Sequence, residues 1–219
     1  SDPAPPSITK NPADATVCEG ASLTVNSAGG NGGAGTITDQ FRYSTDNGSS
    51  WSAWGTTTPA FSAVTGTNVF QSRRTATGPG CNSPSSSNAV SWAVNADPGF
   101  SVNPTGGTIC VATDHAMSVT ASGGIGAYAY QWQSFDGSWT DIAGANSSSY
   151  TATPGSTTDY RCIVSTAGTG CTDGNSSTAT ITTTSPNTTG LAGGDYVWTG
   201  YSSADWETSS NWLNFTGTE

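Results

Sequence analysis

A domain-sized internal repeat constrains the fold of this 219-residue chain more than any other feature. Asn11-Pro12 precedes Cys18, and Asn103-Pro104 precedes Cys110 at the same spacing. Later positions correspond at a separation of about 90 residues, namely Trp51 with Trp139, Phe70 with Tyr160, and Cys81 with Cys171. A repeat of this length is large enough to bury a modest core of its own. The sequence therefore predicts two tandem domains of similar architecture.

The predicted domain boundaries follow the repeat and the changes in composition. The first copy covers residues 1–96 and the second 97–185, and each copy opens on an Asp-Pro pair. Residues 186–219 begin as a linker and continue as a segment that contains Trp198, Trp206 and Trp212 and matches neither copy. We interpret residues 186–219 as a linker and the Trp-rich start of a further module. The alternative is that these tryptophans form a ligand-binding surface, because clustered exposed apolar residues mark such surfaces.

Short alternating segments separated by turn residues predict an all-β fold. Aromatic and polar residues alternate from Tyr128 until Asp136-Gly137, a dipeptide that tolerates the positive φ angles of a tight hairpin turn. Asn47-Gly48 is its counterpart in the first copy. No segment has a helical period, and Tyr160 precedes Cys162 by two residues, as in the tyrosine corner of immunoglobulin-type sandwiches. We expect two tandem immunoglobulin-like β-sandwiches.

The charge of the chain excludes several classes of partner. Charged residues make up 9% of the chain and its net charge is −10, with a pI of about 4.1. Nucleic acids and anionic membrane surfaces are bound through basic patches, and the five Lys and Arg residues of this chain are too few to form an extensive one. No apolar run approaches the ~20 residues that span a bilayer, so no membrane insertion is expected.

The five cysteines predict disulfides, because the composition is that of an extracellular chain and no CxxC metal-binding pair is present. The first copy holds only two cysteines, which predicts a Cys18–Cys81 bond. The equivalent bond in the second copy is Cys110–Cys171, which leaves Cys162 as a free buried thiol. The alternative is a Cys110–Cys162 bond, with Cys171 free.

No catalytic constellation is visible, so we expect no enzyme activity, no cofactor and no metal. His115 is the only histidine, and no GxSxG-like nucleophile context accompanies it. Most carboxylates are single aspartates in turns, where Asp supports the turn itself. Trp51, Trp132 and Trp139 are expected to pack in the cores, with sugar stacking as the alternative.

Both copies resemble the immunoglobulin-like modules that are strung in tandem along very large surface proteins of Bacteroidota. The second copy carries the resemblance best, and the first lacks the strand tryptophan and has Phe70 where the second has Tyr160. The residues that carry it are Val17-Cys18-Glu19-Gly20, Tyr130-Gln131-Trp132-Gln133, Trp139-Thr140-Asp141-Ile142, Ala143-Gly144-Ala145, Tyr160-Arg161 and Gly170-Cys171.

The resemblance implies a non-catalytic, structural and adhesive role. Proteins of this kind leave the cell by type IX secretion, act at the cell surface, and include gliding adhesins. Their partners would be a surface ligand or glycan and the neighbouring modules of the same chain. The alternative is a carbohydrate-binding or spacer module of a secreted glycoside hydrolase.

Overall fold

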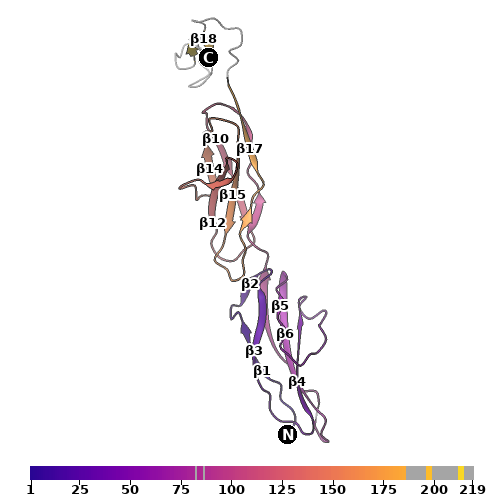
Figure 1. The fold of residues 1–219 in the computed structure, drawn as a ribbon. Helices are drawn as coiled ribbons and strands as arrows, with labels where there is room; N and C mark the ends of the chain where they lie inside the picture. The colour runs from indigo at the N-terminus through magenta and orange to yellow at the C-terminus, as the bar shows by residue number, and fades with distance from the viewer. Residues whose placement is uncertain (82, 86, 186–195, 199–211, 215–219) are drawn as a thin grey trace. The chain divides into compact units, whose positions relative to one another are not determined.

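The computed structural model describes residues 1–185 except 82 and 86, together with the short strands 196–198 and 212–214. Every regular element among them is a β-strand (Figure 1), which confirms the expected all-β class. None of these described residues belongs to a helix that could cross a membrane. The chain divides into two compact units, and residues 121–129 and 164–174 of the second repeat belong to the first unit, together with residues 1–99.

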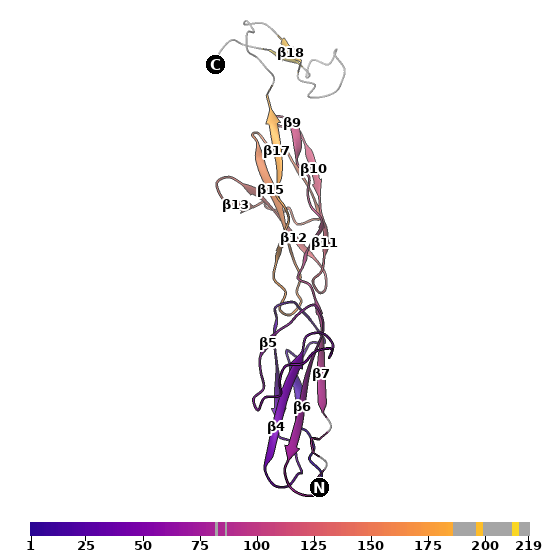
Figure 2. The same cartoon turned by 90° about the vertical axis from the view of Figure 1, so that its right-hand side faces the viewer.

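Two sheets form the first repeat. The larger sheet has the order β2-β7-β6-β4, with β2 parallel to β7 and antiparallel pairing elsewhere, and Figure 2 shows β7, β6 and β4 side by side. The smaller sheet has the order β1-β3-β5. The strands are β1 (Ser7–Asn11), β2 (Thr16–Cys18), β3 (Ser22–Ala28), β4 (Ile37–Ser44), β5 (Phe61–Ser62), β6 (Gly66–Ala76) and β7 (Asn88–Asn95).

Side chains from both sheets of the first repeat meet in one core. Leu23 of β3 and Phe61 of β5 pack in one cluster with Phe70 of β6 and Trp92 of β7. The Phe61 ring stands edge-on to Trp92, with 6.4 Å between the ring centroids. Such inward-facing residues alternate with outward ones along each strand, which is why the sequence pattern has a period of two. The first repeat is therefore a β-sandwich.

The second repeat has the same plan. Its main sheet has the order β13-β12-β15-β17-β9, with β16 beside β15 and β9 parallel to β17, and two further pairs are β10-β14 and β8-β11. The strands are β8 (Gly99–Val102), β9 (Gly107–Cys110), β10 (His115–Ser118), β11 (Thr120–Ser122), β12 (Ala129–Phe135), β13 (Trp139–Asp141), β14 (Ser149–Ala152), β15 (Thr158–Ser165), β16 (Gly174–Asn175) and β17 (Ala179–Thr184). The prediction of tandem immunoglobulin-like sandwiches is confirmed.

The fully buried tryptophan lies on a different strand in each of the two cores. In the second core Trp132 of β12 is fully buried and its indole N–H donates to the Ser147 carbonyl at 2.9 Å. In the first core Phe41 takes the corresponding place on β4, and the fully buried indole is Trp92 of β7, where β17 has Ile181. The first copy thus replaces the missing strand tryptophan by one on another strand of the same sheet, with β6 between the two strands.

The predicted turns form with the backbone angles that they require. Asn47 and Gly48 have φ values of 56° and 84°, and Gly137 has a φ of 75° between β12 and β13. These are left-handed conformations, which Asn and Gly adopt at low cost.

Two strands are described beyond the second repeat. β18 (Tyr196–Trp198) pairs antiparallel with β19 (Trp212–Asn214), so that the backbones of Trp198 and Trp212 stand opposite each other. Trp206 lies outside the described residues. The interpretation of this segment as a further module or a binding surface stays a prediction.

Truncating the buried indole of either core should destabilise the protein strongly. We expect Trp132→Ala to lower the free energy of unfolding of the second sandwich by about 3–5 kcal/mol, through lost apolar burial and the cavity left behind. Urea unfolding followed by fluorescence and hydrogen exchange would measure it. The control is Val102→Ala, whose side chain is 52% exposed. Equal shifts in the two variants would contradict the assignment of Trp132 to the core.

Candidate functional site

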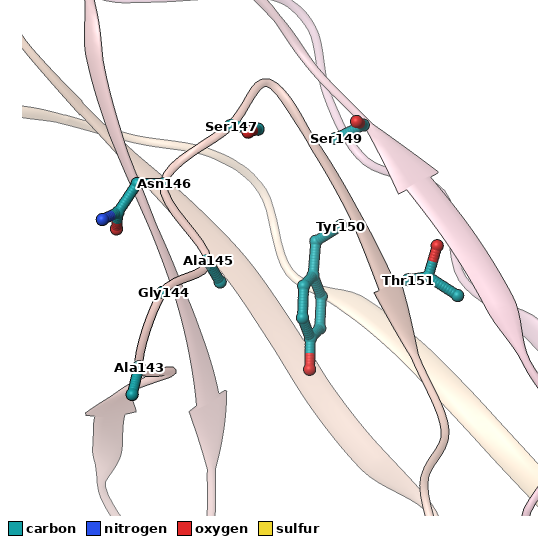
Figure 3. A pocket seen from close by; sticks show the side chains of 8 residues that line it. All are labelled: Ala143, Gly144, Ala145, Asn146, Ser147, Ser149, Tyr150 and Thr151. Carbon is teal, nitrogen blue, oxygen red and sulfur yellow. The ribbon is translucent and has the colours of Figure 1, made fainter.

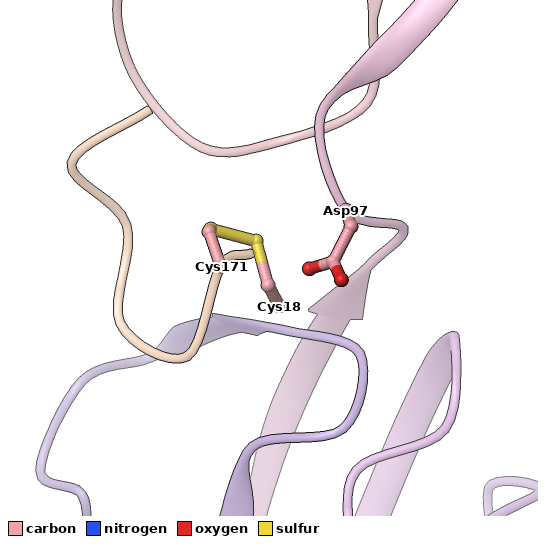
Figure 4. Close-up of side chains that lie close together, drawn as sticks. All are labelled: Cys18, Asp97 and Cys171. Carbon is pink, nitrogen blue, oxygen red and sulfur yellow. A yellow bond between two sulfur atoms is a disulfide. The ribbon is translucent and has the colours of Figure 1, made fainter. Parts of the chain in front are cut away.

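A disulfide joins a residue of the first repeat to a residue of the second. Cys18 ends β2, and Cys171 lies in the loop between β15 and β16 (Figure 4). The two cysteines are 153 positions apart in the sequence, and Cys18 is fully buried. Both belong to the first compact unit, which includes residues 164–174.

The predicted pairs Cys18–Cys81 and Cys110–Cys171 are wrong. Cys18 is paired in register with Asn95, the last residue of β7, whereas Cys81 lies in the loop that precedes β7. β7 has eight residues, and at ~3.3 Å per residue that strand separates the two cysteines by roughly 25 Å. A disulfide needs its Cα atoms within about 7 Å. In the second repeat β17 lies between Cys171 and Cys110 in the same way, because Cys110 is in register with Thr184.

Hydrogen bonds fix the loop of Cys171 around the disulfide. The Cys18 backbone N–H donates to the Thr169 carbonyl at 2.9 Å, and the Thr169 hydroxyl donates to the Asp14 carboxylate at 2.6 Å. The Thr172 hydroxyl and backbone N–H both donate to the Asp97 carboxylate. The loop is therefore held on both sides of the sulfur bridge.

Gly170 shows how closely this loop approaches the first repeat. Its φ is 78°, and a Cβ atom built on it would lie 2.4 Å from the Cβ of Ala21. Only glycine fits both the backbone angle and the space. The contact excludes bulk from the position directly before Cys171.

Cys18, Cys171 and Asp97 are residue types that bind metals, but here the two cysteines are oxidised to a disulfide. Potential ligand atoms of Cys18, Asp97 and Cys171 lie within 4.8 Å of one another. Metals bind cysteine as the thiolate, and both sulfurs are already bonded to each other. The Asp97 carboxylate is occupied by Thr172. We assign this cluster a structural role.

The other three cysteines are free thiols with different exposure. Cys110 is exposed, Cys81 is half-buried, and Cys162 is buried in the second core. Burial raises the pKa of the Cys162 thiol to about 11. Cys162 is thus shielded both from solvent and from deprotonation.

Arginines cover tryptophans on the outer face of β4 and β6. The Arg42 guanidinium lies 4.2 Å from the Trp51 ring centroid and 4.4 Å from that of Trp54. Arg73 lies 4.1 Å from the Trp54 centroid. Such cation–π contacts contribute about 0.5–1 kcal/mol each at exposed sites. We call Arg42, Trp51, Trp54 and Arg73 the arginine–tryptophan cluster.

The second repeat carries a smaller version of the arginine–tryptophan cluster. Arg161 lies 4.3 Å from the Trp139 ring centroid, and its Nε donates to Gln133 at 2.7 Å. Trp51 and Trp139 are therefore not core residues, whereas Trp132 is. Sequence reasoning placed Arg73 and Arg161 on the outer faces of their strands but missed Trp54 and the contacts of the arginines with tryptophan rings. The sequence signal for this cluster was the pair of tryptophans in Trp51-Ser52-Ala53-Trp54, which follows the predicted strand that contains Arg42.

A hydrogen-bonded turn positions Trp51. The Ser50 hydroxyl donates to the Asp46 carboxylate at 2.6 Å, its backbone N–H donates at 2.8 Å, and the Ser44 hydroxyl donates at 2.7 Å. These bonds, with the Ser50 hydroxyl contributing most, lower the pKa of Asp46 to about 2. Trp51 then packs over Gly48, where an added Cβ would lie 3.2 Å from its ring.

A shallow pocket of about 220 Å³ lies beside β14 (Figure 3). The Tyr150 ring forms one wall, and the rest is formed by Ser149 and Thr151 of the same strand and by residues 143–147 of the preceding loop. Tyr150 packs on Trp132 of the core, with 5.8 Å between the ring centroids. The pocket is lined by hydroxyl and amide groups. Among the described residues that line it, Tyr150 is the one titratable side chain.

His115 makes a structural contact. One of its ring nitrogens lies 3.1 Å from the Thr105 carbonyl oxygen, and the ring covers Gly107. The neighbouring Asp114 accepts a hydrogen bond from Thr153 at 2.6 Å. A catalytic histidine would instead need a nucleophile within hydrogen-bond reach.

Disulfide mapping should find a Cys18–Cys171 peptide in the oxidised chain. We expect Cys110 and Cys81 to react with an alkylating reagent in the folded protein, and Cys162 only after unfolding, because it is buried and its pKa is raised. Mass spectrometry of unreduced digests would measure both. A Cys18–Cys81 peptide would contradict the structure.

The Asp46 turn should weaken only at very low pH. Because its pKa of about 2 lies below the ordinary value of 3.8, the carboxylate stabilises the turn above about pH 4 and loses this effect as the pH falls towards 2. Carboxyl-carbon NMR would follow the titration. As a control, Ser50→Ala removes the main cause and should bring the midpoint closer to 3.8. An unchanged midpoint would contradict this cause.

One family model matches part of the chain. The family model described as Domain of unknown function (DUF8696) matches residues 102–185, within the second repeat. No curated protein matches the chain.

Solved structures with tandem immunoglobulin domains are similar at low sequence identity. The N-terminal eight Ig domains of Down Syndrome Cell Adhesion Molecule match with 13% identity and a TM-score of 0.48, over 84% of this chain and 25% of that one. Three N-terminal domains of the bacteriophage RB49 Highly Immunogenic Outer Capsid protein match with 10% identity and a TM-score of 0.47, over 77% and 66%. DIP-gamma IG1+IG2 matches with 10% identity and a TM-score of 0.44, over 84% and 98%. This chain thus spans a quarter of the length of the first of these structures.

Proposed function

We propose that this chain is a non-catalytic pair of stalk modules in a large secreted surface protein, with a structural and adhesive role. The observation that carries the proposal is the Cys18–Cys171 disulfide, which connects two tandem sandwiches instead of closing one of them. A bond between repeats stabilises an array of modules. The residues described around this disulfide offer no catalytic group that would give the bond a role in catalysis.

The stabilisation by such a bond is large on the scale of a small sandwich. In the chain-entropy model, closing a loop across 153 positions removes unfolded-state entropy worth about 5 kcal/mol. Small domains have a total stability of about 5–15 kcal/mol. The disulfide also restrains the loop of Cys171, which Thr169 and Thr172 hold by hydrogen bonds.

The chemistry of the chain supports an extracellular, cell-surface location. Disulfides persist in oxidising compartments, and an acidic chain with 9% charged residues has little affinity for nucleic acid. Taken with the resemblance to tandem modules of Bacteroidota surface proteins, this supports export by type IX secretion and a place in an adhesin, including those of gliding motility. The neighbouring modules are its first partners, and a surface ligand or glycan is the second.

The alternative function is a carbohydrate-binding or spacer module of a secreted glycoside hydrolase. The arginine–tryptophan cluster favours it, because no described carboxylate forms an ion pair with Arg42 or Arg73. Their guanidinium groups instead contact Gln71 and Gln40. A surface with indole edges and two guanidinium groups that form no ion pair with a described carboxylate suits an acidic polysaccharide.

Binding to immobilised uronate-containing polysaccharides would test the alternative. If it is correct, Arg42→Gln with Arg73→Gln should abolish binding, because both guanidinium groups are lost, while Arg161→Gln serves as the control in the other repeat. Absence of binding to acidic and neutral polysaccharides by the unaltered chain would exclude the carbohydrate-binding form of the alternative.

The stalk proposal predicts that the disulfide limits motion between the repeats. Spin labels on the native thiols Cys81 and Cys110 report on this motion, since one lies in each repeat and neither is fully buried. Double electron–electron resonance should give a narrow distance distribution in the oxidised chain. We expect a broader one in the Cys18→Ser, Cys171→Ser double variant. Equal widths would remove the main support for the proposal.

A further inference from the structure

The ends of β2 and β9 are equivalent, although only one of them carries a bonded cysteine. Cys18 is in register with Asn95, and Cys110 is in register with Thr184, both in parallel pairs at the end of the last strand of a repeat. The next residue donates back across the pair in both cases, Glu19 to Asn95 at 2.8 Å and Val111 to Thr184 at 3.1 Å. Gly20 and Ala112 then both have positive φ, 81° and 59°.

The loops of Cys81 and Cys171 are equivalent as well. Gly32 approaches the Asp2 carbonyl as Gly123 approaches that of Asp97, and an added Cβ would lie 2.3 Å from the oxygen in both. The residue two positions after each of these glycines, Ala34 or Ile125, contacts a glycine of the cysteine loop. An added Cβ on Gly78 would lie 2.5 Å from Ala34, and one on Gly168 would lie 2.6 Å from Ile125.

The equivalent surfaces differ in one respect, which is whether a neighbour covers them. Gly170 is in contact with Ala21, whereas Gly80, with nearly the same φ of 76°, has none of the described atoms within 4 Å of an added Cβ. Cys18 is fully buried, whereas Cys110 is exposed. Cys110 therefore occupies the position of Cys18, and Cys81 occupies the position of Cys171, but neither is bonded to a partner cysteine.

We propose that Cys81 and Cys110 form the same bond with other modules of this type, so that modules of this type in direct succession are bonded head to tail. Cys110 of one module would pair with the Cys81-type residue of the module after it. Cys81 would pair with the Cys18-type or Cys110-type residue of the module before it. This inference deepens the proposed stalk function and rests on it, because it requires tandem modules as partners.

The bond needs a disulfide as oxidant. The Cys110 thiolate attacks glutathione disulfide and releases one glutathione, and the Cys81 thiolate then attacks the mixed disulfide and releases the second. Two cysteine thiols lose two protons and two electrons in this sequence. One glutathione disulfide becomes two glutathione thiols.

A tandem of this chain provides the test. Residues 1–185 are joined directly to a second copy that starts at Asp2, so that Thr184-Ser185-Asp2-Pro3 reproduces the spacing of Asn95-Ala96-Asp97-Pro98. The protein is oxidised in a glutathione redox buffer, and unreduced digests are mapped by mass spectrometry. We expect a Cys110–Cys81 peptide across the new joint and a Cys18–Cys171 peptide within each copy. The folded tandem should then have two fewer free thiols than two separate chains.

Matched variants separate this bond from chance oxidation. Cys81→Ser in the second copy alone should leave Cys110 of the first copy as a reactive thiol, with both Cys18–Cys171 bonds intact. A flexible six-residue insertion at the new joint should slow formation of the Cys110–Cys81 bond several-fold, because the geometry of the joint brings the thiols together.

Each outcome decides between the two proposals. If Cys81 and Cys110 stay thiols at the new joint, or pair with Cys162, while both Cys18–Cys171 bonds form, the head-to-tail inference is wrong and the stalk function stands. If the Cys18–Cys171 bonds also fail to form, both proposals are wrong.

Discussion

The structure of the joint depends on one covalent bond and on the strand register that places it. Because β2 runs parallel to β7, Cys18 lies at the end of the first sheet where the chain leaves for the second repeat. The loop of Cys171 meets it there, and the Thr169, Gly170 and Thr172 contacts hold the loop on both sides. Strand direction thus decides which cysteines can meet. Sequence proximity within a repeat does not.

The bond also changes how the chain would carry tension. A force applied to the two ends reaches Cys18, crosses the sulfur bridge to Cys171, and continues towards residue 219. The strands between these cysteines, which include the central strands of both cores, lie outside this covalent path. An array with such a bond at each joint could not be lengthened by unfolding its modules. This property agrees with the structural role proposed above.

Sequence reasoning succeeded where local patterns decide the structure. Alternation and the Asn47-Gly48 and Asp136-Gly137 turns predicted β-hairpins, because each depends on neighbouring residues alone. The period of about 90 residues then predicted two copies of the same sandwich, because it can be read directly from the sequence. The disulfide pairing was wrong because it depends on which end of a sheet each cysteine occupies, and a single sequence does not show strand register. The arginine–tryptophan cluster was missed for the same reason, since Arg73 meets Trp54 only after β4 and β6 pair. Trp92 compensates for the missing strand tryptophan from another strand, which no alignment of the two copies would show.

Single-molecule pulling on the ends of the chain tests the central claim most directly. With the disulfide intact, the 153 positions between Cys18 and Cys171 cannot extend, which withholds roughly 550 Å of contour length at ~3.6 Å per residue. We expect the oxidised chain to show only the short extension of its outer segments, and the full extension to appear after a reductant is added. Full extension of the oxidised chain, unchanged by the reductant, would contradict a bond that ties the two repeats together.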